Sequence, residues 1–375
     1  MIVKNAKVVL SDKVVNKGYL KISKGLITEI GKDYKGKDKT VVDAKGMIIM
    51  PGFIDVHMHG SAGIDFMDAK AKDYKTIAKS LYNEGVTTFL ATTLTSDNKS
   101  LANVCREVKE AKESNPSLLG IHFEGPYINA KYKGAQNEKF IRNPDIEEFD
   151  KLQRISGGNV KYISMAPEKP GSLAFIEHVS GSGVVVSAGH TDASFGDVEK
   201  AIKKGLTNTT HTHNAMSPHH HRNPGVVSAA MYFDELYTEC ICDRIHVCDN
   251  TLRTFMKVVT PERFVMITDA LKIKNSKINK FQLFGLDCVR KDGAAYLTSG
   301  PLAGSLLTMD QGIRNIKQVC KLGLVDLAKI SSRNAARSLH LEDRGEIKVG
   351  ALADLVLLDE KLSVKQVYKL GKRVK

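Results

Sequence analysis

The chain has 375 residues, of which 42% are hydrophobic and 26% are charged, and its formal net charge is +13. This length and balance indicate a globular protein with one large domain and a smaller companion, and they exclude a disordered chain. Polar residues interrupt the opening segment and no later apolar run reaches membrane-spanning length, so we expect a cytoplasmic protein without signal peptide or membrane contact.

The excess positive charge comes mostly from lysines spread along the chain, without an arginine-rich tract or interleaved aromatic residues. We therefore expect a solvated surface that steers small anionic substrates, and no nucleic-acid partner. The six cysteines lack a CxxC pair, which indicates reduced and mostly buried thiols; they stand at positions 105, 240, 242, 248, 288 and 320.

Both ends of the chain have strand character. Residues 1–49 alternate polar and apolar positions in short runs broken by turns, and residues 341–375 have the same pattern. The two ends are predicted to form one small β-sandwich domain.

The central part, residues 50–340, alternates short apolar strands with helical stretches such as 71–85, 98–115 and 309–323. Repeated strand and helix over this length predicts an α/β fold, a (β/α)8 TIM-like barrel. No sequence repeat of fixed period accompanies it.

Residues of the types that commonly bind metals follow the predicted apolar strands. His57 and His59 follow GMIIMPGFIDV, Glu124 follows SLLGI, His190 follows GVVVSA, and Asp269 follows RFVMI. Barrel enzymes keep their active sites at the carboxyl ends of the strands, so these side chains are predicted to meet there.

The pair His57 and His59 is two residues apart, and on a strand such residues face the same side. Imidazole and carboxylate are ligands that Zn²⁺ and similar ions prefer, and an open coordination position would hold water. A bound metal lowers the pKa of that water to about 7, and Asp269 would transfer the proton to the leaving amine.

Other catalytic motifs are missing or incomplete in the sequence. Residues 31–38 approach a phosphate-binding P-loop, but Asp38 stands where Ser or Thr is required, and the chain has no GxSxG motif. The run at positions 219–221 is His-His-His, whose side chains point in different directions, which favours a loop beside the site over a metal tract.

Seven ordered segments carry a resemblance to one family: PGFIDVHMHG, HFEGPYIN with KGAQ, SAGHTDA, THTHNAMSPHHHRNPG, CDRIHV, ITDA and LAGSLLTM. The chain resembles the N-acetylglucosamine-6-phosphate deacetylase family of the amidohydrolase superfamily. The resemblance implies that Glu124, His190 and His211 hold the principal metal and that Asp269 is the general base and acid. It allows a second ion at His57 and His59, with Glu124 as bridge. One or two divalent ions per subunit are expected, Zn first, with Fe, Mn or Co as alternatives.

The resemblance also assigns the substrate-binding positions, which are Ala135, Gln136, Asn214, Ala215, Arg222, His246, Leu302, Ala303 and Gly304. Arg222 and His246 suit a phosphate group, with main-chain NH groups around Asn214 and Ala215 as further donors. Some members carry histidine where this chain has Gln136, whose amide can donate to the acetyl carbonyl but cannot titrate.

The implied activity is removal of the acetyl group from N-acetylglucosamine 6-phosphate, giving glucosamine 6-phosphate and acetate. Alternatives are a deacetylase of N-acetylgalactosamine 6-phosphate, a cyclic-amide amidohydrolase, or a non-enzymatic protein that has kept the barrel. We expect a homodimer or homotetramer, and whether Arg222 and His246 act within one subunit or across an interface stays open. Arg244, where relatives often have glycine, either lies near the phosphate or points to the surface.

Overall fold

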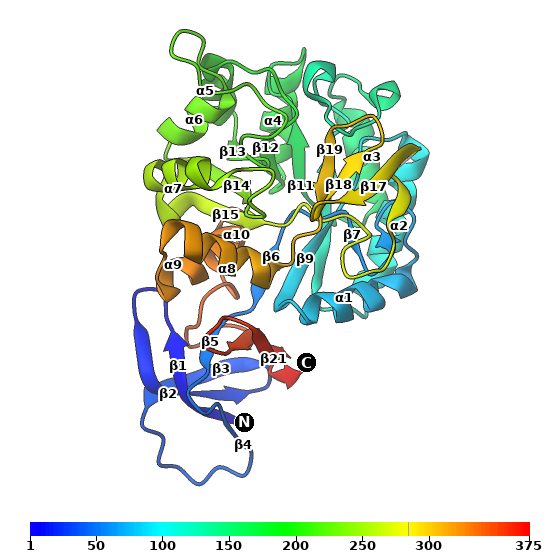
Figure 1. Cartoon of the computed structure of the whole chain (residues 1–375). Helices are drawn as coiled ribbons and strands as arrows, with labels where there is room; N and C mark the ends of the chain where they lie inside the picture. The colour runs from blue at the N-terminus through cyan, green and yellow to red at the C-terminus, as the bar shows by residue number, and fades with distance from the viewer. Residues whose placement is uncertain (284) are drawn as a thin grey trace.

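The central sheet consists of eight parallel strands in the order β15-β14-β13-β12-β11-β10-β9-β6. The computed structural model describes residues 1–283 and 285–375. The strands of this sheet are β6 (Phe53–Asp55), β9 (Val86–Thr92), β10 (Leu118–Glu124), β11 (Val160–Met165), β12 (Val185–Ala188), β13 (Leu206–Thr209), β14 (Tyr237–Ile241) and β15 (Phe264–Ile267). Helices cover its outer face (Figure 1).

The helices are α1 (Tyr74–Tyr82), α2 (Asn98–Lys112), α3 (Ile146–Ile155), α4 (Ser172–Gly181), α5 (Phe195–Ile202), α6 (Val226–Tyr232), α7 (Asp249–Arg263), α8 (Met309–Cys320), α9 (Leu324–Ala328) and α10 (Asn334–Ser338). Helix α1 shows why they form: Tyr74, Ile77, Ala78 and Leu81 are buried at a spacing of three or four residues, which puts them on one face. All seven residues of β9 are buried, as expected for a parallel strand covered on both sides.

The barrel is closed at one seam by loop contacts, because β6 and β15 are the two edges of the sheet. The Thr268 hydroxyl donates to the Asp55 carboxylate at 2.6 Å. The main-chain NH of Asp269 donates to the His57 carbonyl at 2.8 Å, and that of His59 to the Ala270 carbonyl at 2.9 Å. The seam therefore runs through two of the segments that carry predicted site residues.

Strands from both ends of the chain form a second sheet, ordered β22-β21-β20-β5-β1-β2-β3 with β4 beside β1. They are β1 (Ile2–Val9), β2 (Val14–Ser23), β3 (Leu26–Lys32), β4 (Val41–Asp43), β5 (Ile48–Pro51), β20 (Leu355–Leu358), β21 (Val364–Lys369) and β22 (Lys372–Arg373). In Figure 1 the blue and red ends of the chain lie together below the barrel.

The two faces of this terminal sheet are buried in different cores. Ile48 and Met50 of β5 belong to the apolar cluster of the barrel, whereas Ile49 belongs to a separate cluster with Val3, Leu20 and other residues of the sheet. This follows from the alternation of side chains along a strand. The predicted α/β barrel with a β domain from both termini is confirmed. The boundaries at 49 and 340 stay predictions, and β5 runs across the first of them.

A small antiparallel sheet that the sequence analysis did not predict lies between β15 and α8. Its strands are β16 (Lys280–Leu283), β17 (Leu286–Lys291), β18 (Ala294–Leu297) and β19 (Leu302–Ser305). Asp292 and Gly293, with φ of 47° and 84°, make the two-residue turn between β17 and β18. Such turns favour Asp-Gly because both positions need positive φ.

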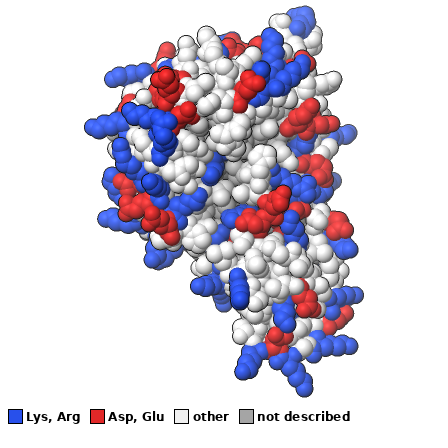
Figure 2. Space-filling model, turned by 180° about the vertical axis from the view of Figure 1, so that it is seen from behind, with Lys and Arg blue, Asp and Glu red and all other residues white. Residues whose placement is uncertain are grey.

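Lysine and arginine side chains are interspersed with acidic ones on the face shown in Figure 2. Among the residues described, none of the helices is both long and apolar enough to cross a membrane.

Candidate active site

The predicted metal ligands lie at the carboxyl ends of the barrel strands. Glu124 is the last residue of β10, and His190 and His211 stand two residues beyond β12 and β13. His57 and His59 follow β6, which ends at Asp55, so they extend from the loop after the strand and not from the strand itself. The rings of His57 and His59 nevertheless face the same cluster, with their centres 5.4 Å apart.

The Glu124 carboxylate is the centre of this cluster. Its Oε1 lies 3.1 Å from Nε2 of His190, 3.0 Å from Nε2 of His211 and 3.2 Å from Nε2 of His57. Its Oε2 lies 3.4 Å from Nε2 of His59. All five side chains are nearly excluded from solvent.

The far ring nitrogens show which atoms are available to a cation. Nδ1 of His190 lies 2.8 Å from the main-chain carbonyl of Tyr132, and Nδ1 of His57 lies 3.0 Å from the Glu239 carboxylate. Since those oxygens can only accept, each Nδ1 donates to its partner, and Nε2 is the nitrogen that faces the cluster. Ring nitrogens and a carboxylate that face one another at such distances could hold a cation between them.

Asp269 lies at the edge of the cluster, next to the histidine pair. Its Oδ1 is 3.2 Å from Nε2 of His59 and 3.6 Å from Nε2 of His57. Burial alone would raise the pKa of Asp269, but the hydrogen bond to His59 and the charge of His57 lower it. Asp269 is therefore a carboxylate at neutral pH, the form that can accept a proton.

Three of these residues have a strained main chain. The φ angles of His190, His211 and Asp269 are 48°, 30° and 48°. Residues other than glycine rarely adopt this left-handed main-chain conformation, and those that do are concentrated at functional sites. Here the conformation turns each chain sharply after its strand and directs the side chain to the centre.

A cavity of about 330 Å³ opens above the cluster. His59, Glu124, His190, His211 and Asp269 form its floor, which leaves their polar atoms accessible from one side. The predicted substrate positions that line it are Ala135, Gln136, Asn214, Ala215, His246, Leu302, Ala303 and Gly304. The last three belong to β19, so the small antiparallel sheet forms one wall.

The model of the amidohydrolase family matches residues 48–374 of the chain. The chain belongs to the amidohydrolase family. It is 36% identical to the N-acetylglucosamine-6-phosphate deacetylase of Lysinibacillus sphaericus over 351 residues, which are 93% of this chain and 91% of that protein. The crystal structure of N-acetylglucosamine-6-phosphate deacetylase from Thermotoga maritima has a TM-score of 0.92 and 35% identity, covering 100% of this chain and 99% of that one. The motif-based recognition of the deacetylase family is confirmed.

A relative named for a different sugar is also similar to this amidohydrolase. The N-acetylgalactosamine-6-phosphate deacetylase of Escherichia coli O157:H7 is 31% identical over 336 residues, covering 88% of this chain and 89% of that protein. Family membership therefore leaves the configuration at the sugar's C4 open.

The amidohydrolase family implies a divalent metal, and the structure brings together two groups that could hold one. They are His57, His59 and Asp269, and His57, Glu124 and His211, with ligand atoms within 4.8 Å of one another in each group. His57 belongs to both groups, and since its Nδ1 faces Glu239, only its Nε2 could serve an ion.

Gln136 contacts one of the predicted metal ligands and also lines the cavity. Its amide NH₂ donates to Glu124 Oε2 at 2.5 Å, and its carbonyl accepts from the main-chain NH of Thr95 at 2.7 Å. The amide thus orients Glu124. Since an NH₂ group has two hydrogens, the predicted bond to the acetyl carbonyl stays compatible with this contact.

Two groups that were expected to contact the phosphate, the main-chain NH of Asn214 and the side chain of Arg222, do not point into the cavity as expected. The main-chain NH of Asn214 donates to the His211 carbonyl at 2.9 Å, so it is engaged within the loop. Arg222 is exposed and does not line the cavity; its guanidinium lies 2.7 Å from Nε2 of His221. His246 does line it, with Nδ1 2.6 Å from Asp243 Oδ2.

Arg244 points to the surface. Its guanidinium makes two bonds to the Asp249 carboxylate, at 2.8 and 2.6 Å, at the start of α7. Of the two alternatives left open for this residue, the structure selects the surface-pointing one.

Sequence reasoning missed the residues that hold the ligands in place. Glu239 could have been found from the strand YTECI, because a lone carboxylate in a buried strand needs a partner. Asp243, three residues before His246, could also have been found by spacing. The Tyr132 carbonyl has no sequence signal, because it is a main-chain atom of a loop.

Proposed function

We propose that the protein is a metal-dependent deacetylase that converts N-acetylglucosamine 6-phosphate to glucosamine 6-phosphate and acetate. The observation that carries the proposal is the convergence of Glu124, His190 and His211 beside the Asp269 carboxylate at the floor of one cavity. The relatives at 36% and 35% identity that carry this name support it.

Glu124, His190 and His211 would hold the principal ion, and His57 and His59 a second, with Zn as the first candidate. When bound, a divalent cation polarises the acetyl carbonyl and lowers the pKa of the attacking water to about 7. Burial would lower the pKa of His57, but Glu124 and Glu239 raise it well above its usual value. His57 would therefore have to give up a proton in order to hold an ion.

Asp269 moves the proton that the hydrolysis requires. Its carboxylate accepts one from the attacking water and passes it to the sugar nitrogen as the carbon–nitrogen bond breaks. The water oxygen leaves in acetate and the nitrogen leaves as the amine. One side chain can serve both transfers because the water and the nitrogen bond to the same carbonyl carbon.

The phosphate would bind at the other end of the cavity, near His246. Burial opposes the charged form of this histidine, but Asp243 raises its pKa, which favours an imidazolium that can donate to an anion. Arg222 would complete the site from the neighbouring subunit of a homodimer. The proposal is supported by its exposure and by its position outside the cavity of its own chain.

Acetate release from a panel of sugars tests the proposal. The panel contains N-acetylglucosamine 6-phosphate, N-acetylgalactosamine 6-phosphate and both unphosphorylated sugars, each with and without a chelator. We expect turnover of the first, loss of activity on chelation and recovery with added Zn²⁺. Faster turnover of the galactosamine substrate would select the alternative, and full activity of protein shown to be metal-free by elemental analysis would contradict the mechanism.

A further inference from the structure

Glu239 is a buried carboxylate to which the catalytic scheme assigns no role. It lies on β14 in the barrel interior, and its side chain has no exposure to solvent. Burial of a carboxylate is costly unless it is paired, so its retention here calls for specific partners.

One oxygen of Glu239 has two partners, both in metal-binding segments. Its Oε2 lies 3.0 Å from Nδ1 of His57 and accepts the main-chain NH of His211 at 3.2 Å. The first contact fixes the ring of His57, and the second holds the loop that places His211. The same atom therefore links two predicted ligands that follow different strands of the barrel, β6 and β13.

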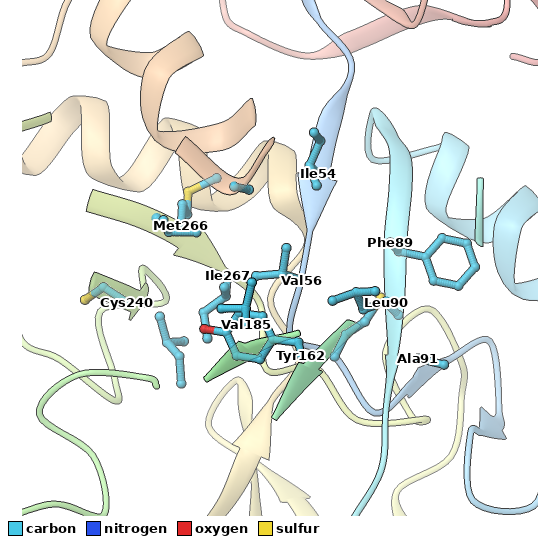
Figure 3. Close-up of a cluster of buried hydrophobic side chains, with 14 of the residues drawn as sticks. Ile54, Val56, Phe89, Leu90, Ala91, Tyr162, Val185, Cys240, Met266 and Ile267 are labelled. Carbon is cyan, nitrogen blue, oxygen red and sulfur yellow. The ribbon is translucent and has the colours of Figure 1, made fainter. Parts of the chain in front are cut away.

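The other oxygen of Glu239, Oε1, is a buried atom without a hydrogen-bond partner among the described residues, and so is the hydroxyl oxygen of Tyr162. Burial, followed by the charge of Glu239, raises the pKa of Tyr162 well above its usual value, so the tyrosine keeps its proton. Figure 3 shows Tyr162 in the surrounding apolar cluster.

We propose that Glu239 is the positioning residue for the ion at His57. The inference rests on the metal site of the proposed function. A carboxylate that accepts from Nδ1 fixes the ring orientation, keeps Nε2 free and makes that nitrogen a stronger ligand. His59, whose Nδ1 is buried without a hydrogen-bond partner in the part of the chain that the structure describes, has no such support.

The test measures zinc binding by chelator-stripped protein, with stoichiometry from elemental analysis and affinity from competition with a chromophoric chelator. Glu239→Ala should lower the affinity for the His57-dependent ion by about 10- to 100-fold, the usual effect of removing such a partner. Glu239→Gln should be milder, because its amide carbonyl still accepts from Nδ1.

Two reference variants separate this role from general damage. Thr238→Val alters the adjacent buried residue of β14, whose side chain faces the opposite side of the strand, and should leave zinc binding unchanged. His57→Ala should abolish binding of the same ion whose affinity Glu239→Ala lowers. In spectra of ¹⁵N-histidine-labelled, zinc-loaded protein, the Nδ1 proton of His57 should be protected from exchange in wild type and Glu239→Gln.

Wild-type zinc affinity and stoichiometry in folded Glu239→Ala or Glu239→Gln protein, with the expected loss in His57→Ala, would overturn the role of Glu239 alone. A wild-type protein that binds no zinc would instead overturn the proposed metal site together with this inference.

Discussion

The main-chain NH of Asp269 donates a hydrogen bond to the main-chain carbonyl of His57 at 2.8 Å. This bond crosses the seam between β15 and β6, the two edge strands of the barrel sheet, which do not pair with each other. The proposed base and a proposed metal ligand thus keep their relative position through the main chain, independently of what their side chains bind.

Asp269→Asn should therefore change the chemistry more than the geometry. Asparagine keeps the shape and the main-chain bond but cannot accept the proton, so kcat should fall by about 10²- to 10⁴-fold, the usual contribution of general acid–base catalysis. Substrate affinity and the principal metal should be retained, because their proposed contacts are elsewhere. The measurements are kcat, substrate binding and metal content on one preparation, and a folded, metal-loaded variant within about tenfold of the wild-type kcat would remove Asp269 from this role.

Mixed dimers show whether Arg222 acts across a subunit interface. Arg222→Ala and Asp269→Asn each damage the site, but a dimer with one subunit of each kind would contain one intact site if the arginine acts on its neighbour. Co-expression should then restore about a quarter of the wild-type rate, since half of the dimers are mixed and each has one intact site of two. No rescue in dimers verified to be mixed would place Arg222 in its own subunit's site.

Arg244→Ala should leave KM for the phosphorylated sugar unchanged, because the side chain binds Asp249 at the surface. The hydrogen bond from Arg244 lowers the pKa of Asp249 in the folded protein. Its stabilising effect is present above the unfolded pKa of about 3.9 and is lost as pH falls through the lower folded value. The difference in melting temperature between wild type and variant should therefore be seen at neutral pH and shrink under acid conditions; a raised KM would bring the residue back to the phosphate site.

Glu84 and Lys274 form a buried ion pair that should matter for stability. Their side chains are 2% and 0% exposed, with 3.1 Å between Lys274 Nζ and Glu84 Oε1. Glu84→Gln leaves the ammonium without its counterion, and breaking a buried pair in this way costs about 3–5 kcal/mol. Denaturant unfolding should show this loss, and the double variant Glu84→Gln, Lys274→Met should recover part of it. Equal stabilities of the double and single variants would show that the unpaired charge is not the cause.

Hydrophobic periodicity and metal-type residues at strand ends predicted the barrel and predicted that Glu124, His190 and Asp269 lie together, whereas His211 was identified by the family resemblance. These signals are local to each strand, and parallel strands place their carboxyl ends together. The sheet from β16 to β19 was missed because its short strands lie inside a region assigned to the barrel. The position of Arg222 could not be predicted either, because a motif identifies a residue but does not show the direction in which its exposed loop turns.

The terminal sheet has a consequence for the order of events during protein synthesis. Strand β5 pairs with β1 on one side and with β20 on the other, through Met50 and Val356 among others. A ribosome releases residues 48–51 about 300 positions before residues 355–358. Until then one edge of β5 is open to pairing with another chain. Strand β20, which is translated much later, therefore protects an edge of β5, and a nascent chain stalled before residue 355 exposes that edge to aggregation.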